Sequence, residues 1–353
     1  MRTAYSPSTA NYRPALEMAR AGQPPMFDVP ERAQSVLDRI QATQLGAVET
    51  AQDFGLAPLL RVHSADYVDF LQRAWGQWPT DRLPSVALPQ FWPARGSGLV
   101  QRPASVVGQL GYYAADSIAP LVAGTWAAAL ASAQTALTAQ RWVTEGAPAA
   151  FALCRPPGHH ASADQMAGYC YLNNAAIAAQ ACIDGGAQRV ALLDVDYHHG
   201  NGTQRIFYER DDVLFASIHV DPLHDYPYFI GHADELGRGA GLGYNLNCPL
   251  PPGSGWAVWS TALAHCMDRI SLFRADVLVV SLGVDAHHAD PSGSFKLSSA
   301  DFTPIGQRLG ALGLPTLFVF EGGYAVEPAG LNVVNVLQGF EAVAAQSSRR
   351  TRS

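Results

Sequence analysis

The chain has 353 residues, of which 48% are hydrophobic and 15% charged, which is enough apolar material for a large buried core. Its formal charge of −7 at pH 7 offers no general basic surface, so we expect neither a nucleic-acid partner nor binding to a membrane. No apolar run has membrane-spanning length, no secretory leader is visible, and five cysteines without a CxxC pair argue against a disulfide framework, so we expect a cytoplasmic protein.

The pattern of apolar runs predicts a single α/β domain. A segment rich in proline, tryptophan and glycine, 77–103, is expected to be a long loop that shapes an entrance or an oligomer contact. Alanine-rich helices are predicted at 125–140 and 173–183, and buried strands at 149–154, 190–195, 213–218, 277–282 and 316–320. Alternating strands and helices predict a three-layer α/β/α domain with a mainly parallel sheet over residues 1–345, followed by a disordered tail at 346–353.

Polar residues follow each predicted strand. They lie at 155–160, 194–199, 219, 285 and 321–324. Because ligands of parallel sheets bind beyond the carboxyl ends of the strands, we expect these residues to meet in one site.

The segment 193–200 carries the strongest chemical signal. Asp194, Asp196 and His198 alternate along a strand end, so their side chains point to one side. Carboxylate and imidazole ligands without a nearby cysteine are typical of a catalytic metal site that keeps one position open for water. Asp285, after another predicted strand, is the candidate third ligand. The alternative is a strand end with solvated polar groups, but buried carboxylates need partners that offset their desolvation.

Two histidines and a tyrosine are candidate acid–base and oxyanion groups. His159 and His160 lie on a turn stiffened by proline and glycine, and adjacent imidazoles suit acid–base work when different partners hold them. Asp194 and Asn201 are the candidate partners. Tyr324 follows two glycines after the last predicted strand, where its hydroxyl would donate to a developing oxyanion or, equally, lie buried in the core.

With these motifs in order, the sequence resembles the histone deacetylase superfamily, whose fold is the arginase–deacetylase fold with about eight strands. The resemblance rests on residues 155–160, 168–174, 194–204, 283–285 and 321–324. The branch that it resembles most is that of the bacterial acetylpolyamine amidohydrolases, through residues 111–116, 226–235 and the long loop before them. The resemblance implies removal of acetyl-type groups from small amines, and a homodimer or higher homo-oligomer.

The resemblance also implies roles for individual residues. Asp196, His198 and Asp285 would bind one Zn²⁺, with Fe²⁺ or Co²⁺ as substitutes. His160 would be the general base, His159 paired with Asp194 would help to deliver a proton to the leaving amine, and Tyr324 would polarise the scissile carbonyl. A structural K⁺ would be held by Asp194, Asp196, His198, Ser217 and Ile218. The substrate tunnel would be built from Tyr169, Tyr226, Gly168 and, as a candidate contact, Asp116.

Departures from the family pattern bear on the substrate. The partner of His160 would be Asn201, where some branches have aspartate, and Ser292 supplies no acid to sense a polyamine. His287 and His288 follow the third ligand and are left out of the site. A protein-lysine deacetylase and an amidase for another small amide, including a xenobiotic one, therefore stay open as alternatives.

Other classes of protein lack key residues. There is no glycine-rich phosphate loop followed by lysine, and no Gly-x-Ser-x-Gly elbow of a serine hydrolase. An arginase-like enzyme with two metal ions would need carboxylates that this chain does not have, since Gly283 stands where a further aspartate is expected. A binding protein on the same fold would be expected to have lost a ligand or Tyr324.

Overall fold

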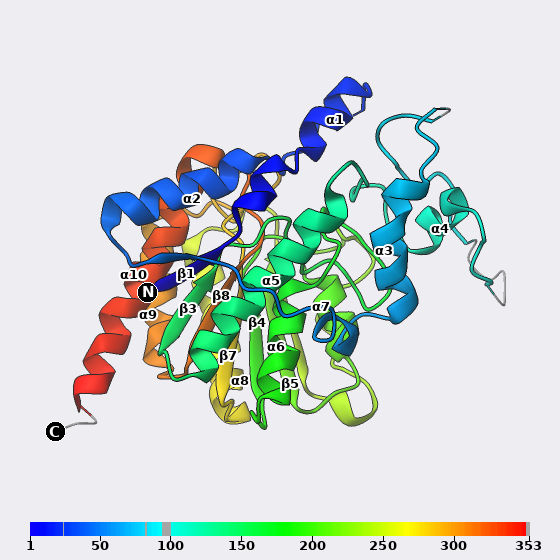
Figure 1. Ribbon diagram of the computed structural model, residues 1–353. Helices are drawn as coiled ribbons and strands as arrows, with labels where there is room; N and C mark the ends of the chain where they lie inside the picture. Colours follow the sequence, from blue (N-terminus) through cyan, green and yellow to red (C-terminus); the bar gives the residue numbers. More distant parts are fainter. Residues whose placement is uncertain (24, 82, 94–99, 351–353) are drawn as a thin grey trace.

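An eight-stranded parallel sheet forms the centre of the molecule (Figure 1). The computed structural model describes residues 1–23, 25–81, 83–93 and 100–350. The strands follow the order β2-β1-β3-β8-β7-β4-β5-β6, and every neighbouring pair is parallel. Their bounds are β1 Arg2–Tyr5, β2 Val48–Thr50, β3 Ala149–Ala152, β4 Val190–Asp194, β5 Val213–Val220, β6 Asn245–Leu250, β7 Val277–Leu282 and β8 Thr316–Phe320.

Helices cover both faces of the sheet, as the sequence predicts. Figure 1 shows α5, α6 and α7 in front of the strands, and α2, α9 and α10 on the other side. The helices are α1 Pro14–Arg20, α2 Pro30–Thr43, α3 Ala65–Gln77, α4 Val106–Tyr112, α5 Thr125–Thr144, α6 Asn174–Asp184, α7 Asn201–Phe207, α8 Trp256–Phe273, α9 Phe302–Ala311 and α10 Val326–Arg350. Among the described residues, no helix is both long and apolar enough to cross a membrane.

Alternating strand residues supply the two halves of the core. In β8, Phe318 and Phe320 pack into the cluster beneath α2, α8, α9 and α10, whereas Leu317 and Val319 pack into the cluster beneath α5 and α6. Because successive side chains of a strand point to opposite faces, a strand buried on both faces is apolar throughout. This explains why β8 and its neighbours are visible in the sequence as unbroken apolar runs.

A third apolar cluster supports the insertion beside the sheet. It joins the start of α5 to α3 and α4, and these last two helices lie to one side of the strands in Figure 1. Within 77–103, Trp78 donates to the Pro84 carbonyl at 2.9 Å, and Ala87 forms a bridge with Leu121. Between Trp78 and Ser105 no helix or strand is formed by the described residues, which agrees with the predicted loop; residues 82 and 94–99 lie outside them.

The C-terminal tail differs from the prediction. Helix α10 ends only at Arg350, so the segment 346–350, expected to be disordered, continues the helix; residues 351–353 lie outside the described part.

Candidate active site

Residues from four loops meet at one edge of the sheet. Strands β3, β8, β7 and β4 are consecutive parallel neighbours, so their carboxyl ends lie side by side. The loops after these strands carry, in this order, His159 with His160, then Tyr324, then Asp285, then Asp196 with His198. Motifs that are up to about half the chain apart in sequence therefore form one cluster.

Asp196, His198 and Asp285 form a group that is able to hold a metal ion, and we call these three side chains the metal-type group. One ligand atom from each side chain lies within 4.8 Å of the other two. His198 Nδ1 lies 3.3 Å from Asp196 Oδ1 and 3.1 Å from Asp285 Oδ2. Both carboxylates are fully buried, and buried acids need positive charge close by. Donor set, spacing and burial together fit a divalent ion such as zinc.

The same group attracts positive charge in the bare protein. Burial acts to lower the pKa of His198, but hydrogen bonds to Asp196 and Asp285 outweigh burial and raise the pKa to about 10. A proton on His198 thus provides the cationic charge that these acids require. A metal ion bound by the same three side chains would supply that charge instead.

Two glycines let the backbone approach these ligands. A Cβ on Gly322 would lie 2.4 Å from an oxygen of both Asp196 and Asp285, and a Cβ on Gly283 would lie 2.1 Å from Asp196 Oδ2. The Gly322 amide donates to Asp196 Oδ2 at 2.7 Å. No side chain larger than hydrogen fits at either place without moving a ligand.

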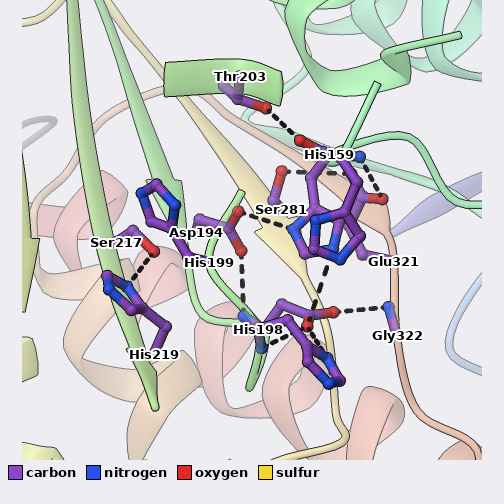
Figure 2. Close-up of polar contacts among 12 residues, drawn as sticks. His159, Asp194, His198, His199, Thr203, Ser217, His219, Ser281, Glu321 and Gly322 are labelled. Carbon is purple, nitrogen blue, oxygen red and sulfur yellow. Dashed lines mark hydrogen bonds and ion pairs between the residues drawn. The ribbon is translucent and has the colours of Figure 1, made fainter. Parts of the chain in front are cut away.

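His159 is paired with buried acids. Its Nδ1 lies 3.0 Å from Asp194 Oδ2 (Figure 2). Burial acts to lower the pKa of His159, but the charges of Asp196 and Asp194 outweigh burial and raise the pKa to about 10. Glu321 holds the backbone beneath it, accepting the amides of Gly158 at 2.6 Å and His159 at 3.2 Å. The turn at 155–160 is therefore fixed through its backbone as well as through the imidazole.

His160 has a neutral partner and stays neutral. Its Nδ1 lies 2.6 Å from Asn201 Oδ1, at the first residue of α7, so that Nδ1–H donates to the amide oxygen and Nε2 is left as an acceptor. Burial, with the charges of His159 and His198, holds the pKa of His160 well below its usual range. The geometry thus presents an unprotonated imidazole nitrogen beside the metal-type group.

Tyr324 is fixed on one face by Arg32. The Arg32 guanidinium lies 4.4 Å from the centre of the Tyr324 ring, and its Nε donates to the Gly323 carbonyl at 2.7 Å. Burial raises the pKa of Tyr324 well above its usual value, so the hydroxyl keeps its proton. Tyr324 can therefore act as a hydrogen-bond donor.

A narrow cavity of about 130 Å³ borders the site. It is lined by Phe27, Ile118, His160, Gly168, Tyr169, His198, Tyr226, Ser292 and Tyr324. The structure thus brings Tyr169, Tyr226 and Gly168 together as the resemblance implies. No carboxylate is among these lining residues of the described chain.

Asp116 contacts two residues of this narrow cavity and does not itself line it. It accepts the Tyr226 hydroxyl at 2.6 Å and the Gly168 amide at 3.1 Å, and it lines a neighbouring cavity of about 370 Å³. Burial raises the pKa of Asp116, although the hydrogen bond from Tyr226 opposes this rise. The candidate substrate contact of the sequence analysis therefore lines the neighbouring cavity, which His160 and Tyr226 also line.

The five residues expected around a monovalent cation lie on the adjacent strands β4 and β5 and on the loop that follows β4. Asp194 and Ser217 are register partners in β4 and β5, Ile218 follows Ser217, and Asp196 and His198 continue from β4. The Ser217 hydroxyl also lies 2.8 Å from His219 Nδ1 (Figure 2). The structure brings these residues to one edge of the sheet beside the metal-type group.

Some residues of the site were missed in the sequence. Glu321 lies within 321–324, which the sequence analysis expected in the site, but it was given no role of its own. Arg32 and Asp28 gave no such signal, because they lie more than 100 residues from every motif that they support. His287 and His288, which were left out, contact Ser299 and the Leu297 carbonyl respectively and not the metal-type group.

Comparison with known proteins agrees with this geometry. A model of the histone deacetylase domain matches residues 26–340. The chain is 56% identical over 323 residues to acetylpolyamine amidohydrolase 1 of Pseudomonas aeruginosa, and the alignment covers 91% of this chain and 93% of that protein. It is 45% identical over 315 residues to the acetylpolyamine amidohydrolase of Mycoplana ramosa, covering 89% and 92%.

The fold is shared with a solved structure from the same group. The crystal structure of acetylpolyamine aminohydrolase from Burkholderia pseudomallei superposes with a TM-score of 0.90 at 40% identity, covering 97% of this chain and 99% of that one. The expected arginase–deacetylase fold is thereby confirmed, as is the resemblance stated from the motifs. From these matches and the site geometry it follows that the chain belongs to the histone deacetylase family.

Proposed function

We propose that this chain is a zinc-dependent amidohydrolase that removes acetyl or similar acyl groups from small amines, above all from acetylpolyamines. One observation carries the proposal: the buried group of Asp196, His198 and Asp285 borders a narrow cavity that is also lined by a neutral His160 and by Tyr324. The relatives named acetylpolyamine amidohydrolase support this choice of substrate.

The reaction needs both a stronger nucleophile and a more reactive carbonyl. Zinc held by Asp196, His198 and Asp285 would supply Lewis-acid polarisation and would lower the pKa of water towards neutrality. His160 Nε2 accepts a proton from the attacking water, since Nδ1 is engaged with Asn201 Oδ1. The same nitrogen then returns this proton to the leaving nitrogen as the C–N bond breaks, and the second proton of the water follows, so that water and amide become carboxylate and ammonium.

Two further groups act on charge that develops during the reaction. The Tyr324 hydroxyl donates to the carbonyl oxygen as it becomes an oxyanion, because burial keeps that hydroxyl protonated. His159 stays cationic beside Asp194 and stabilises the site electrostatically while the proton reaches the leaving nitrogen. Tyr169 and Tyr226 exclude water and hold an aliphatic chain in the tunnel.

Two substrate alternatives follow from specific features. The lining of the tunnel in the described residues carries no carboxylate for a distal ammonium, which leaves room for a neutral small amide, including a xenobiotic one. A protein-lysine deacetylase would use the same chemistry. A loop at 77–103 that narrows the approach to the tunnel would exclude such a folded-protein substrate.

Three features of the cellular protein belong to the same proposal. A K⁺ ion at Asp194, Asp196, His198, Ser217 and Ile218 would stabilise the end of β4 and β5. A homodimer through 77–103 is supported by exposed Phe91 and Trp92, of which 65% and 44% are accessible. A cytoplasmic location is supported by the five cysteines, which are all free.

The test is a comparison of substrates with and without a chelator. Rates are measured on acetylputrescine, acetylspermidine, an acetyl-lysine peptide and a neutral N-alkyl amide. We expect the acetylpolyamines to be cleaved about 10² faster than the others, which is roughly 2.7 kcal/mol of discrimination, and the chelator to abolish all cleavage. A faster peptide would identify a protein deacetylase, and activity on the neutral amide alone would reject the polyamine substrate.

The site assignment has a separate test. Asp285→Ala should remove both metal binding and activity, since it deletes one of three ligands and leaves the other buried charges without their partner. Full metal-dependent activity in this variant would refute the assignment.

A further inference from the structure

We propose that Asp290 is a positioning residue that sets the place of the Tyr324 hydroxyl relative to the metal-type group. This inference rests on the role proposed above for Tyr324. Asp290 does not itself line the tunnel, but it binds two residues that do, Ser292 and Tyr324, and it holds Tyr324 through the backbone amide. It was not among the candidate residues of the sequence analysis.

The carboxylate of Asp290 is shared between two loops. Its Oδ2 accepts the backbone amides of Tyr324 at 2.6 Å and Ala325 at 3.0 Å. Its Oδ1 accepts the Ser292 amide at 3.0 Å and the Ser292 hydroxyl at 2.7 Å. Asp290 is only 6% exposed, so these four hydrogen bonds are shielded from water and strengthened by the charge of the acceptor.

Asp290 also caps the amino-terminal end of α10, the helix that follows Tyr324. The first residue of α10 is Val326, and the Ala325 carbonyl accepts the helical hydrogen bond from Ala329 at 3.0 Å. Amides at the start of a helix have no partner within the helix, and an anion there is favoured by the helix dipole. Asp290 therefore caps α10 from a different loop, and Tyr324 is the residue immediately before that cap.

The segment that Asp290 holds has little intrinsic rigidity. Two glycines precede Tyr324, and Gly323 has a φ of +127°, which few other residues adopt. Arg32 fixes the carbonyl side of this segment through Gly323 O. Asp290 fixes the amide side, so the two together hold the backbone of the tyrosine from both sides.

The same carboxylate connects Tyr324 to the metal-type group. Asp290 and the ligand Asp285 belong to one loop after β7, whereas Tyr324 belongs to the loop after β8. The bond from Asp290 to the Tyr324 amide is thus a direct link between the loop of a ligand and the loop of the oxyanion donor. Since a misplacement of about 1 Å costs about 10² in rate, loss of this link should lower kcat.

The experiment measures kcat and KM for Asp290→Ala in the wild-type and in the Tyr324→Phe background. In the wild-type background we expect kcat to fall about 10- to 100-fold, with KM changed less than about threefold. In the Tyr324→Phe background we expect kcat to fall less than about threefold, because the hydroxyl that Asp290 would position is already absent. Equal losses in both backgrounds, or loss of bound metal in Asp290→Ala, would overturn the proposal.

The matched control is Asp276→Ala. Asp276 Oδ2 likewise accepts two consecutive amides, those of Gln188 at 2.8 Å and Arg189 at 3.0 Å, but at the opposite end of the sheet. This control should keep kcat. If Asp290→Ala does not fold, Asp290→Asn keeps the shape with one acceptor oxygen and should give a smaller loss of kcat that again disappears in the Tyr324→Phe background.

Hydrogen exchange supplies a readout that does not depend on activity. The amides of Tyr324 and Ala325 should exchange at least about tenfold faster in Asp290→Ala, and unchanged in Asp276→Ala. Unchanged exchange at both amides would overturn the proposal even if the substrate were misidentified. A wild-type protein without amidase activity would refute the proposed function, whereas the exchange result would still decide the placement of Tyr324.

Discussion

At the scale of single residues, neighbouring groups decide the protonation of two adjacent histidines. The rings of His159 and His160 are 3.9 Å apart between centroids, and both are buried. His159 faces Asp194, and nearby carboxylates outweigh burial and raise its pKa. Burial and the charges of His159 and His198 lower the pKa of His160, and its partner, the Asn201 amide, carries no charge to offset them. One residue is thereby kept as a cation and the next as a neutral base, because only His159 has charged partners that outweigh the effect of burial.

The Tyr324 hydroxyl gives the first prediction. Tyr324→Phe should lower kcat about 10²–10³-fold, because it removes one donor to the developing oxyanion while keeping the ring against Arg32. Steady-state kinetics on the best substrate would measure this. Tyr169→Phe is the control, as it removes a hydroxyl from the same tunnel and should cost much less. A similar loss in both variants would assign the effect to the shape of the tunnel.

The backbone contact at Gly322 gives the second prediction. Gly322→Ala should weaken metal affinity at least about tenfold, since its Cβ would lie 2.4 Å from oxygens of Asp196 and Asp285. Metal content after dialysis and titration with a competing chelator would measure the affinity. Gly76→Ala, where nothing lies within 4 Å of the new Cβ, should bind metal as the wild type does. Unchanged affinity at Gly322→Ala would show that the loop can move aside.

At the scale of elements, burial on both faces determined what the sequence could predict. The five runs interpreted as strands coincide with β3, β4, β5, β7 and β8, which occupy the middle of the sheet and are mostly apolar along their length. Strands β1, β2 and β6 were not identified. They lie toward the two sides of the sheet, and β2, with the sequence Val-Glu-Thr, is largely exposed and has no apolar run to detect.

The site was predictable to the extent that it lies on loops after those strands. Asp196, His198, Asp285, His159, His160 and Tyr324 were all expected to meet, and the structure brings them together. The groups that hold them were not predictable. Asp28, Arg32 and Asp290 act through backbone atoms or through other charges, and such contacts depend on the packing of distant elements.

A buried carboxylate joins these distant elements and gives the third prediction. Asp28 Oδ1 accepts Arg32 at 2.6 Å and Arg155 at 3.1 Å, and all three side chains are fully buried. Asp28→Ala should lower the free energy of unfolding by about 3–5 kcal/mol, because it leaves two buried cations without their partner. Denaturant unfolding would measure the change.

The exposed pair of Asp69 and Arg73 is the control for this prediction. Asp69→Ala removes a salt bridge in which both side chains are more than 40% accessible, so its unfolding free energy should stay close to that of the wild type. Equal effects at Asp28 and Asp69 would mean that the buried network adds nothing beyond a surface ion pair.

At the scale of the whole molecule, buried neutral histidines make folding depend on pH. Burial lowers the pKa of His63 from 6.5 to about 4, and its Nε2 accepts the Asn173 amide at 2.9 Å. Between pH 6.5 and 4 the unfolded chain binds a proton at this residue that the folded chain does not. The free energy of unfolding therefore falls as the pH is lowered through this window, by about 3 kcal/mol in total from His63. Above pH 6.5 His63 causes no such loss.

The fourth prediction isolates this contribution. His63→Gln should show a shallower loss of unfolding free energy between pH 6.5 and 4 than the wild type. His265→Gln, at an exposed position on α8, should leave the slope unchanged. Denaturant unfolding at a series of pH values would measure all three proteins. An identical slope in wild type and His63→Gln would place the acid sensitivity at other groups.

The parallel sheet has a practical consequence for engineering. All strands point the same way, so the amino ends of the strands and the connections leading into them lie on the side opposite the tunnel. That side can take surface attachment points, such as a lysine for coupling to a solid support, without facing the substrate. Libraries for new amide substrates can in turn be confined to the loops at the carboxyl ends, leaving the strand interiors that hold the domain together unchanged.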